Sequence, residues 1–340
     1  MRFLVLFTLV LALSCVIYFG FIHFVDPYGE YGTGSFPVLV LDSRRAKLQL
    51  LHRFGEQGPV GGLILGSSRS LLMRPELLSG TDGSRVFNFA VDNAHAEDFL
   101  AIYHYAIAQG ISPKFLVIGL DIVSLHSDDA HDHMFDRSEL KNYLENAGDT
   151  SSWPPMKWLS DVKSVYTKDY LKDAFKAIWM KTRHQTPKTK FGADGYELQY
   201  SGAQLPEGEI GPQHDFSDDI KSYMQRLSGM REFSPKRLGY LRQLFTEARQ
   251  HNATVVVWLT PIHPRLNELL AQNTNYADLT KKVDAEAENW VSAYGIHYKD
   301  YSDTRTFGGL ETAWSDTTHM DWRNMDRVAR ALVGEVPHGL

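Results

Sequence analysis

The segment GLILGSSRS, residues 62–70, joins a short apolar run to a turn that is rich in hydroxyl groups. The apolar run is bounded by Gly62 and Gly66, and it predicts a strand that is buried on both faces. Ser67 and Ser68 follow this strand directly. Open α/β sheets bind ligands at the carboxyl ends of their strands, so we expect these hydroxyl groups to lie where chemistry takes place.

Three further apolar runs and a weaker fourth segment predict the other strands of a sheet. They occupy residues 86–90, 115–120, 254–260 and 296–299. Helical patterns separate them, over residues 96–109, after Ser234-Pro235 and near residues 325–333. Ser234 and Pro235 suit the N-cap and first position of a helix. Strands that alternate with helices predict an α/β fold with a parallel sheet of five strands.

The composition narrows the classes of function. The chain has 35 Lys and Arg against 41 Asp and Glu, a net charge of −6, so it has no basic excess for the phosphates of nucleic acid. Its one cysteine, Cys15, lies in an apolar run, so the folded part has neither a disulfide nor a cysteine-based metal site.

The amino terminus predicts a membrane anchor. Residues 3–25 carry no formal charge and are long enough to cross a bilayer. Signal peptides have shorter apolar cores and a small-x-small cleavage site, so an uncleaved helix is favoured, with lipidation at Cys15 as a weaker alternative. Arg2 precedes the run, and the next basic residues of the body lie well after it. The positive-inside rule then predicts a single-pass protein of the inner (cytoplasmic) membrane, with a cytoplasmic amino terminus and a periplasmic, extracytoplasmic globular domain.

Three segments follow from these patterns: an anchor (1–25), a connector with a lead-in helix (26–60) and an α/β domain (61–340). The alternation is interrupted between about residues 122 and 233, which predicts a long helical and loop insertion. Insertions at the carboxyl ends of strands often form lids or substrate walls.

A catalytic triad is suggested by residues that are far apart in the chain. Asp316 stands three residues before His319, a spacing that lets the carboxylate bind one imidazole nitrogen. The other nitrogen is then free to take the proton of a serine hydroxyl, which is a weak nucleophile without such a base. Ser68, His319 and Asp316 are therefore the candidate nucleophile, base and acid.

The glycine-ended strand with Ser67-Ser68, together with Asp-x-x-His before a closing helix, resembles the SGNH, or GDSL-like, hydrolase superfamily. The match spans about residues 62–332, with the insertion unmatched. The resemblance implies a three-layer α/β/α domain, with Ser68 as nucleophile and Ser67 in place of the usual Asp. The Gly-Ser-Ser variant behind an anchor is similar to the envelope branch of this group. That branch includes the alginate O-acetyltransferases and the D-alanyl transfer protein of lipoteichoic acid synthesis, which work beside membrane-bound O-acyltransferases.

Two positions depart from the family pattern. Asn93 stands at about the place of the glycine whose N–H serves the oxyanion hole, and its backbone can still donate. Asp121 stands where the family has an Asn side chain, and an ionised carboxylate cannot donate to an oxyanion. Either Asn93 compensates for that donor, Asp121 is protonated, or the site is slow or specialised. Asp121 is therefore also a candidate for orienting Arg69 or His95, and Arg69 for holding an anionic substrate group.

Further residues have both a functional and a structural interpretation. Thr260 and His263 follow the fourth strand and are candidates for lining the pocket, although a structural histidine is equally compatible. The insertion contains a possible metal-binding run, a basic stretch and three tryptophans that could stack on sugars. These are residues 126–133, residues 181–190, and Trp153, Trp158 and Trp179. The ordinary interpretations of these three features are, in the same order, a solvated loop, a solvated run of charges and buried packing. We predict no metal and no cofactor.

The expected function is serine-dependent transfer of an acyl group, with acetyl preferred, to or from a cell-surface polysaccharide, beside a membrane-bound O-acyltransferase. A free carbohydrate esterase is the close alternative. A non-catalytic subunit that binds glycan or assists the acyltransferase is a second, and a flavodoxin-like domain whose turn 66–70 binds phosphate is a third.

Overall fold

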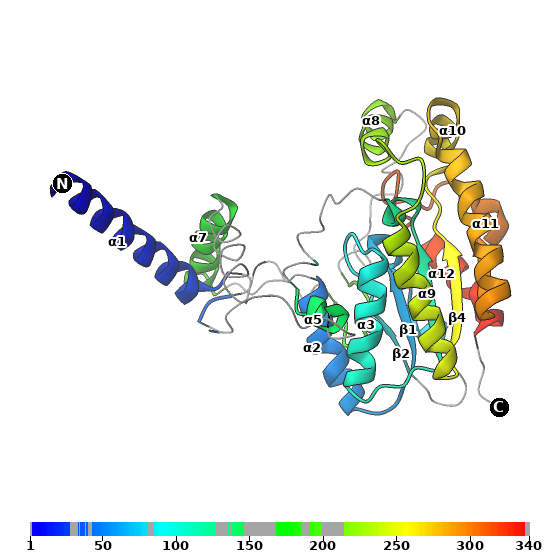
Figure 1. Ribbon diagram of the computed structural model, residues 1–340, viewed down its shortest axis with the longest axis horizontal. Coiled ribbons are helices and arrows are strands. Elements are labelled where there is room, and N and C mark those ends of the chain that lie inside the picture. The colour runs from blue at the N-terminus through cyan, green and yellow to red at the C-terminus, as the bar shows by residue number, and fades with distance from the viewer. Residues whose placement is uncertain are drawn as a thin grey trace. The chain divides into compact units, whose positions relative to one another are not determined.

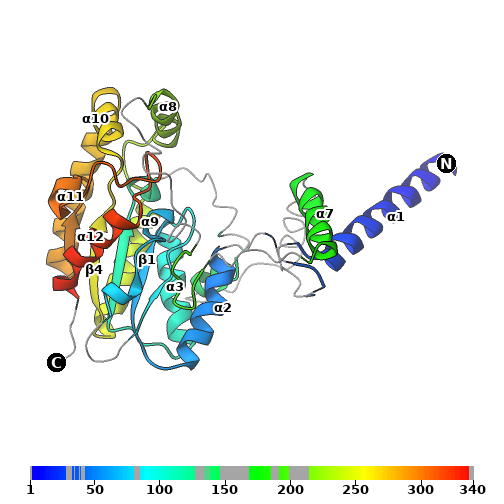
Figure 2. The ribbon, with the colours of Figure 1, turned by 180° about the vertical axis from the view of Figure 1, so that it is seen from behind.

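The computed structural model describes most of the chain, and the two figures of the whole molecule show its course (Figures 1 and 2). The described residues are 2–27, 33, 35–37, 39, 43–79, 85–126, 135, 138–145, 168–184, 191–198 and 214–336. Their contacts divide the chain into two compact units, one of residues 1–45 and 149–188 and the other of residues 46–148 and 189–340. We call them the anchor unit and the α/β unit.

The α/β unit is built on one sheet of five parallel strands in the order β2-β1-β3-β4-β5. The strands are β1 (Val60–Gly66), β2 (Arg85–Asn88), β3 (Phe115–Leu120), β4 (Thr254–Leu259) and β5 (His297–Asp300). The predicted α/β class and the five-stranded parallel sheet are thus confirmed. Strand order changes direction between β1 and β3, and such a switch point opens a crevice outside the carboxyl ends of the strands.

Helices connect the strands, and several begin where local sequence predicted. The longer helices of this unit are α2 (Ser43–Glu56, which starts in the anchor unit), α3 (Ala96–Ala108), α8 (Ser217–Arg226), α9 (Pro235–Gln250), α10 (Pro264–Asn273), α11 (Tyr276–Tyr294) and α12 (Trp322–Leu332), with a short α5 (Leu140–Glu145). Ser234 caps α9 by accepting a hydrogen bond from the Arg237 N–H, and Pro235 occupies the first turn as predicted. Proline is favoured there because its missing N–H has no helical partner at that position.

Alternate residues of the central strands enter two separate hydrophobic clusters. Leu63 and Leu65 of β1 join a cluster with apolar residues of α3, α9 and α11, whereas Ile64 joins a cluster with residues of α12. Helices α3 and α9 lie in front of the strands in Figure 1, and α12 lies towards the viewer in Figure 2. Continuous apolar strands are stable in this arrangement because neither set of side chains meets water.

Two glycines shape the carboxyl edge of the sheet. Gly66 of β1 and Gly119 of β3 are paired in register, and the side chain of Ser70 lies over both. A methyl group at either position would collide with the Ser70 hydroxyl group. The turn that follows β1 can therefore cross the strand ends at close range only because both positions lack a side chain.

The anchor unit contains helix α1 (Arg2–Val25) and helix α7 (Lys168–Thr182). Helix α1 is long and apolar enough to span a membrane, and only 6% of its most apolar window is buried. Ile22 and Val25 of α1 pack with Ala174 and Ala177 of α7. Helix α7 lies within the predicted insertion of residues 122–233.

Candidate active site

The turn after β1 holds Ser67 and Ser68 in different environments. Ser67 is the N-cap of the short 3₁₀ helix η1 (Ser68–Ser70), and its Oγ accepts a hydrogen bond from the Arg69 N–H at 3.2 Å. The Ser67 hydroxyl group donates to the carboxylate of Asp121 and is buried. Ser68 is partly exposed, so it is the serine of this turn that a substrate can reach.

The structure brings Ser68, His319 and Asp316 together although they lie in distant parts of the sequence. Ser68 Oγ lies 2.8 Å from His319 Nε2, and His319 Nδ1 lies 2.7 Å from Asp316 Oδ2. With the proton on Nδ1, the imidazole donates to the carboxylate and accepts from the serine hydroxyl group. This is the order of groups in a serine, histidine and acid triad.

The loop that carries His319 is held at several points. The backbone N–H groups of Thr318 and His319 donate to Asp316 Oδ1 at 2.7 and 2.8 Å. An antiparallel bridge between Trp314 and Met320 closes the loop, and Asp321 caps α12 directly after it. The imidazole is thus fixed between a bridge and a helix start.

Asp316 is ionised at neutral pH. Burial alone would raise its pKa, but the hydrogen bond and charge of His319, together with the N–H groups of Thr318 and His319, hold the pKa well below its usual range. An ionised Asp316 can fix the tautomer of His319 and stabilise the imidazolium that forms when the base takes a proton.

A buried polar network lies directly behind the nucleophile turn. Thr260 and Ser67 both donate to the carboxylate of Asp121. The Arg69 guanidinium lies 3.5 Å from that carboxylate and donates to Thr260 Oγ1 at 3.1 Å and to the Tyr223 hydroxyl group at 2.6 Å. These contacts tie the β1 turn to the ends of β3 and β4 and to helix α8.

The charge of Arg69 is maintained inside this network. Burial opposes the charged form, but the carboxylate of Asp121, together with Tyr223 and Tyr276, outweighs it and raises the pKa of Arg69 above its ordinary value. Both oxygens of Asp121 accept hydrogen bonds, so the observed geometry makes it a positioning group for Arg69 and the turn. Orientation of Arg69 is one of the roles that the sequence suggested for Asp121.

A cavity of about 130 Å³ lies over these groups. It is lined by Ser67, Ser68, Arg69, Asn93, Ala94, His95, Asp121, Val123, Ser124, Arg226, Thr318 and His319. Asn93 lies in the left-handed backbone region, with φ at +52°, and its side chain is exposed. The candidate oxyanion donor Asn93 and the candidate nucleophile Ser68 therefore border the same space.

Helix α8 contributes a side of the site that the sequence did not reveal. Asp219 accepts a hydrogen bond from the Thr317 hydroxyl group at 2.8 Å, Tyr223 accepts from Arg69, and Arg226 lines the cavity. Spacings of four and three residues put all three on one face of the helix. This helix lies in the predicted insertion, where no pattern in the sequence linked it to Ser68.

His263 occupies a structural position. Its Nδ1 accepts a hydrogen bond from the Arg265 N–H at 3.2 Å at the start of α10, and its ring packs against Phe216 and Trp314. Burial lowers its pKa, with a smaller contribution from His214. Neither His263 nor Thr260 is among the residues that line the cavity over Ser68.

The other candidates of the insertion are only partly covered by the structure. His126 is described, and its Nε2 lies 3.0 Å from the Ser228 carbonyl oxygen. Residues 127–133 and 185–190, Trp153 and Trp158 lie outside the described residues. Within the described part of the chain, no group of three or more His, Cys, Asp or Glu residues could hold a metal ion.

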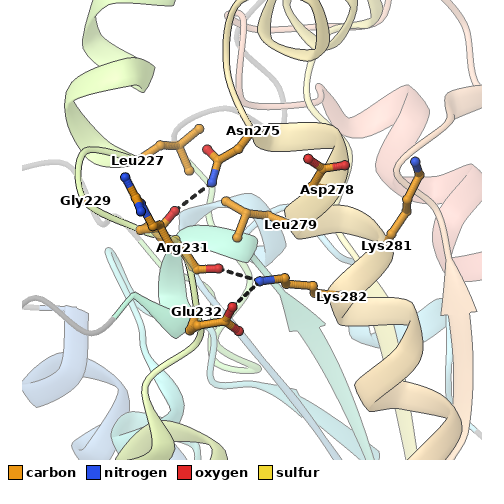
Figure 3. A pocket seen from close by; sticks show the side chains of 10 residues that line it. Leu227, Gly229, Arg231, Glu232, Asn275, Asp278, Leu279, Lys281 and Lys282 are labelled. Carbon is orange, nitrogen blue, oxygen red and sulfur yellow. Dashed lines mark hydrogen bonds and ion pairs between the residues drawn. The ribbon is translucent and has the colours of Figure 1, made fainter.

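A second, larger hollow of about 840 Å³ lies between the residues after α8 and the first turns of α11 (Figure 3). Several of its polar groups are paired with one another: Asn275 donates to the Met230 carbonyl oxygen at 2.7 Å, and Lys282 donates to Arg231 O at 2.7 Å and to Glu232 Oε1 at 2.5 Å. Neither a serine nor a histidine lines it. The smaller cavity is therefore the candidate active site.

No protein-family model and no curated protein matches this sequence.

Proposed function

We propose that the chain is a serine-dependent O-acyltransferase with an SGNH-like, three-layer α/β/α domain, acting on a cell-surface polysaccharide. The observation that carries the proposal is the line of hydrogen bonds from Ser68 through His319 to Asp316 at the edge of the sheet. A hydroxyl group, an imidazole and a carboxylate in this order are what nucleophilic acyl transfer requires.

The proposed reaction has two halves. Ser68 Oγ attacks the carbonyl carbon of the acyl donor while its proton passes to His319 Nε2. The bond between that carbon and the leaving oxygen then breaks, and His319 returns the proton to the leaving group. A hydroxyl group of the glycan next attacks the acyl-serine, with His319 again taking and returning one proton, so that Ser68 is regenerated.

Stabilisation of the oxyanion is assigned to backbone N–H groups at the turn and at Asn93. The family pattern has an additional Asn side chain, and at that place this chain has Asp121, whose oxygens both accept hydrogen bonds. Loss of one oxyanion donor costs about 10²- to 10³-fold in rate. We therefore expect slow turnover of simple esters, with faster reaction when a specific donor is bound.

Transfer is preferred to hydrolysis because of the amino-terminal helix. Helix α1 is long and apolar enough to span a membrane, and the distribution of basic residues favours a cytoplasmic amino terminus. The α/β unit would then face the periplasm, next to polymer and membrane-bound acyl donors. The position of Asp121 favours one second candidate, a non-catalytic subunit that binds glycan for a membrane-bound acyltransferase.

Covalent labelling separates these candidates. The full chain in lipid nanodiscs would be treated with a serine-directed fluorophosphonate, and the adduct would be located by intact mass and peptide mapping. We expect one adduct on Ser68 in the wild type and none in Ser68→Ala or His319→Ala. Ser124→Ala is the matched control, because Ser124 lines the same cavity but hydrogen-bonds only the Asp121 carbonyl oxygen. An unlabelled, folded wild type would favour the non-catalytic candidate.

A further inference from the structure

Helix α7 of the anchor unit has two different faces. Its inner face packs on the carboxyl-terminal part of α1, where Ala174 and Ala177 meet Ile22 and Val25. Leu171 and Ile178 of α7 extend this contact at helical spacing. The helix is therefore held against the end of the apolar helix α1.

The outer face of α7 combines exposed aromatic and basic side chains. Lys172, Phe175, Lys176, Trp179 and Arg183 follow spacings of three and four residues along one side. Phe175 is 59% exposed and Trp179 is 49% exposed, which is unusual for such large apolar side chains. The Arg183 guanidinium lies over the Trp179 ring, 5.3 Å from its centroid. We call these five residues the outer face of α7.

The charge around this face is positive. Within the described residues 171–184, Lys172, Lys176, Lys181 and Arg183 carry positive charge and Asp173 carries negative charge. Lys181 also holds the helix to the connector, because its Nζ donates to Ser35 O at 2.5 Å. The excess of basic residues is complementary to the phosphates of anionic phospholipids.

We propose that α7 lies in the membrane–water interface beside the end of α1, and that its outer face binds anionic phospholipid. Phe175 and Trp179 insert at the level where the acyl chains meet the headgroups, and the basic side chains contact the phosphates. Trp and Phe next to Lys and Arg are typical of helices at this depth. The ring of Phe175 already contacts Phe21 of α1, with centroids 5.5 Å apart, which places it next to the proposed spanning segment. This inference depends on α1 crossing a bilayer and is independent of chemistry at Ser68.

Quenching of tryptophan fluorescence by brominated phospholipid tests the insertion. The full chain would be reconstituted into vesicles of phosphatidylcholine with phosphatidylglycerol, with and without bromine on the acyl chains. The chain has seven tryptophans, so we expect Trp179→Phe to remove a quenched component on the order of one-seventh of the emission. Trp322→Phe is the matched control, because Trp322 is exposed to 43% but belongs to the α/β unit.

The outcomes are distinct. Loss of a quenched component in Trp179→Phe, with none lost in Trp322→Phe, would support the proposal. If the emission removed by Trp179→Phe is as insensitive to brominated lipid as the emission removed by Trp322→Phe, the proposal is overturned and a protein partner for this face is favoured. The double substitution Lys172→Glu with Lys176→Glu tests whether the basic side chains bind anionic lipid. We expect it to reduce the quenching of Trp179 in vesicles that contain phosphatidylglycerol. Unchanged quenching would overturn the proposed charge complementarity.

Discussion

Two hollows among the described residues of the α/β unit differ in how their polar groups are paired. In the cavity over Ser68, groups from β1, β3, α8 and the loop before α12 converge, and a hydroxyl group faces an imidazole that a carboxylate orients. In the larger hollow beside α11, lysine and asparagine side chains satisfy nearby carbonyl oxygens and Glu232. Volume therefore does not identify the reactive site here. A nucleophile, a base and an acid in line do so, and we expect substitutions in the two hollows to differ in their effects.

Removal of the nucleophile is expected to have the largest effect. Ser68→Ala should lower kcat/KM for hydrolysis of 4-nitrophenyl acetate by about 10⁴- to 10⁶-fold, because the substitution removes the proposed nucleophile. Lys282→Ala in the larger hollow should leave that rate within about twofold, as expected of a surface substitution. Equal losses in both variants would mean that the two hollows do not differ in the way proposed.

Asp316→Asn is expected to have the next largest effect. The amide would no longer hold the productive tautomer of His319, so kcat should fall by about 10³- to 10⁴-fold with little change in KM. Steady-state kinetics with the same ester would measure this split. A loss confined to KM would show that Asp316 contacts the substrate and does not orient the base.

The network behind the turn predicts a large effect on stability. Asp121→Ala leaves the Arg69 guanidinium buried without its carboxylate, so the free energy of unfolding should fall by about 3–5 kcal/mol. Urea denaturation of the full chain in detergent would measure the change. The double substitution Asp121→Leu with Arg69→Met should recover most of the loss, since it removes both charges. A double variant as unstable as Asp121→Ala would show that hydrogen bonds, and not the unpaired charge, dominate.

The lowered pKa of Asp316 also predicts a small dependence of the protein's stability on pH. Its pKa is lowered in the folded protein, so the unfolded chain binds the proton more readily and stability rises with pH in this window. The contribution should be complete above the unfolded pKa of about 3.9 and lost as pH falls through the folded value. The difference in melting temperature between wild type and Asp316→Asn should therefore shrink on acidification. A difference that grows in acid would contradict the assigned direction.

The smallest effect is expected in the larger hollow. Glu232 is mostly exposed and its pair with Lys282 is open to solvent, so Glu232→Gln should change the free energy of unfolding by less than about 1 kcal/mol. Added salt should reduce the change further, because exposed pairs are screened. Denaturation at low and high salt would measure it. A loss as large as that of Asp121→Ala would place a buried network in this hollow as well.

Local patterns in the sequence predicted the five strands and the helices α3, α9 and α12, but not α8, α10 or α11. Apolar runs of strand length predicted β1 to β4, because residues buried on both faces must be mostly apolar, whereas the polar and partly exposed β5 was predicted from a weaker pattern. Ser234 and Pro235 predicted the start of α9, since capping depends on adjacent residues. Ser68, Asp316 and His319 could be named together because two of them are neighbours and the third follows a recognisable strand.

Only the tertiary structure decided which distant side chains meet. The register that pairs Gly66 with Gly119 and Gly119 with Trp258 brings Asp121 beside Arg69, and no spacing in the sequence encodes that pairing. Packing of α8 over the strand ends added Tyr223 and Arg226, and packing against α1 gave α7 its inner face. The physical reason is that helices and strands follow from neighbours in the chain, whereas a site depends on contacts between segments whose docking is set by the whole core.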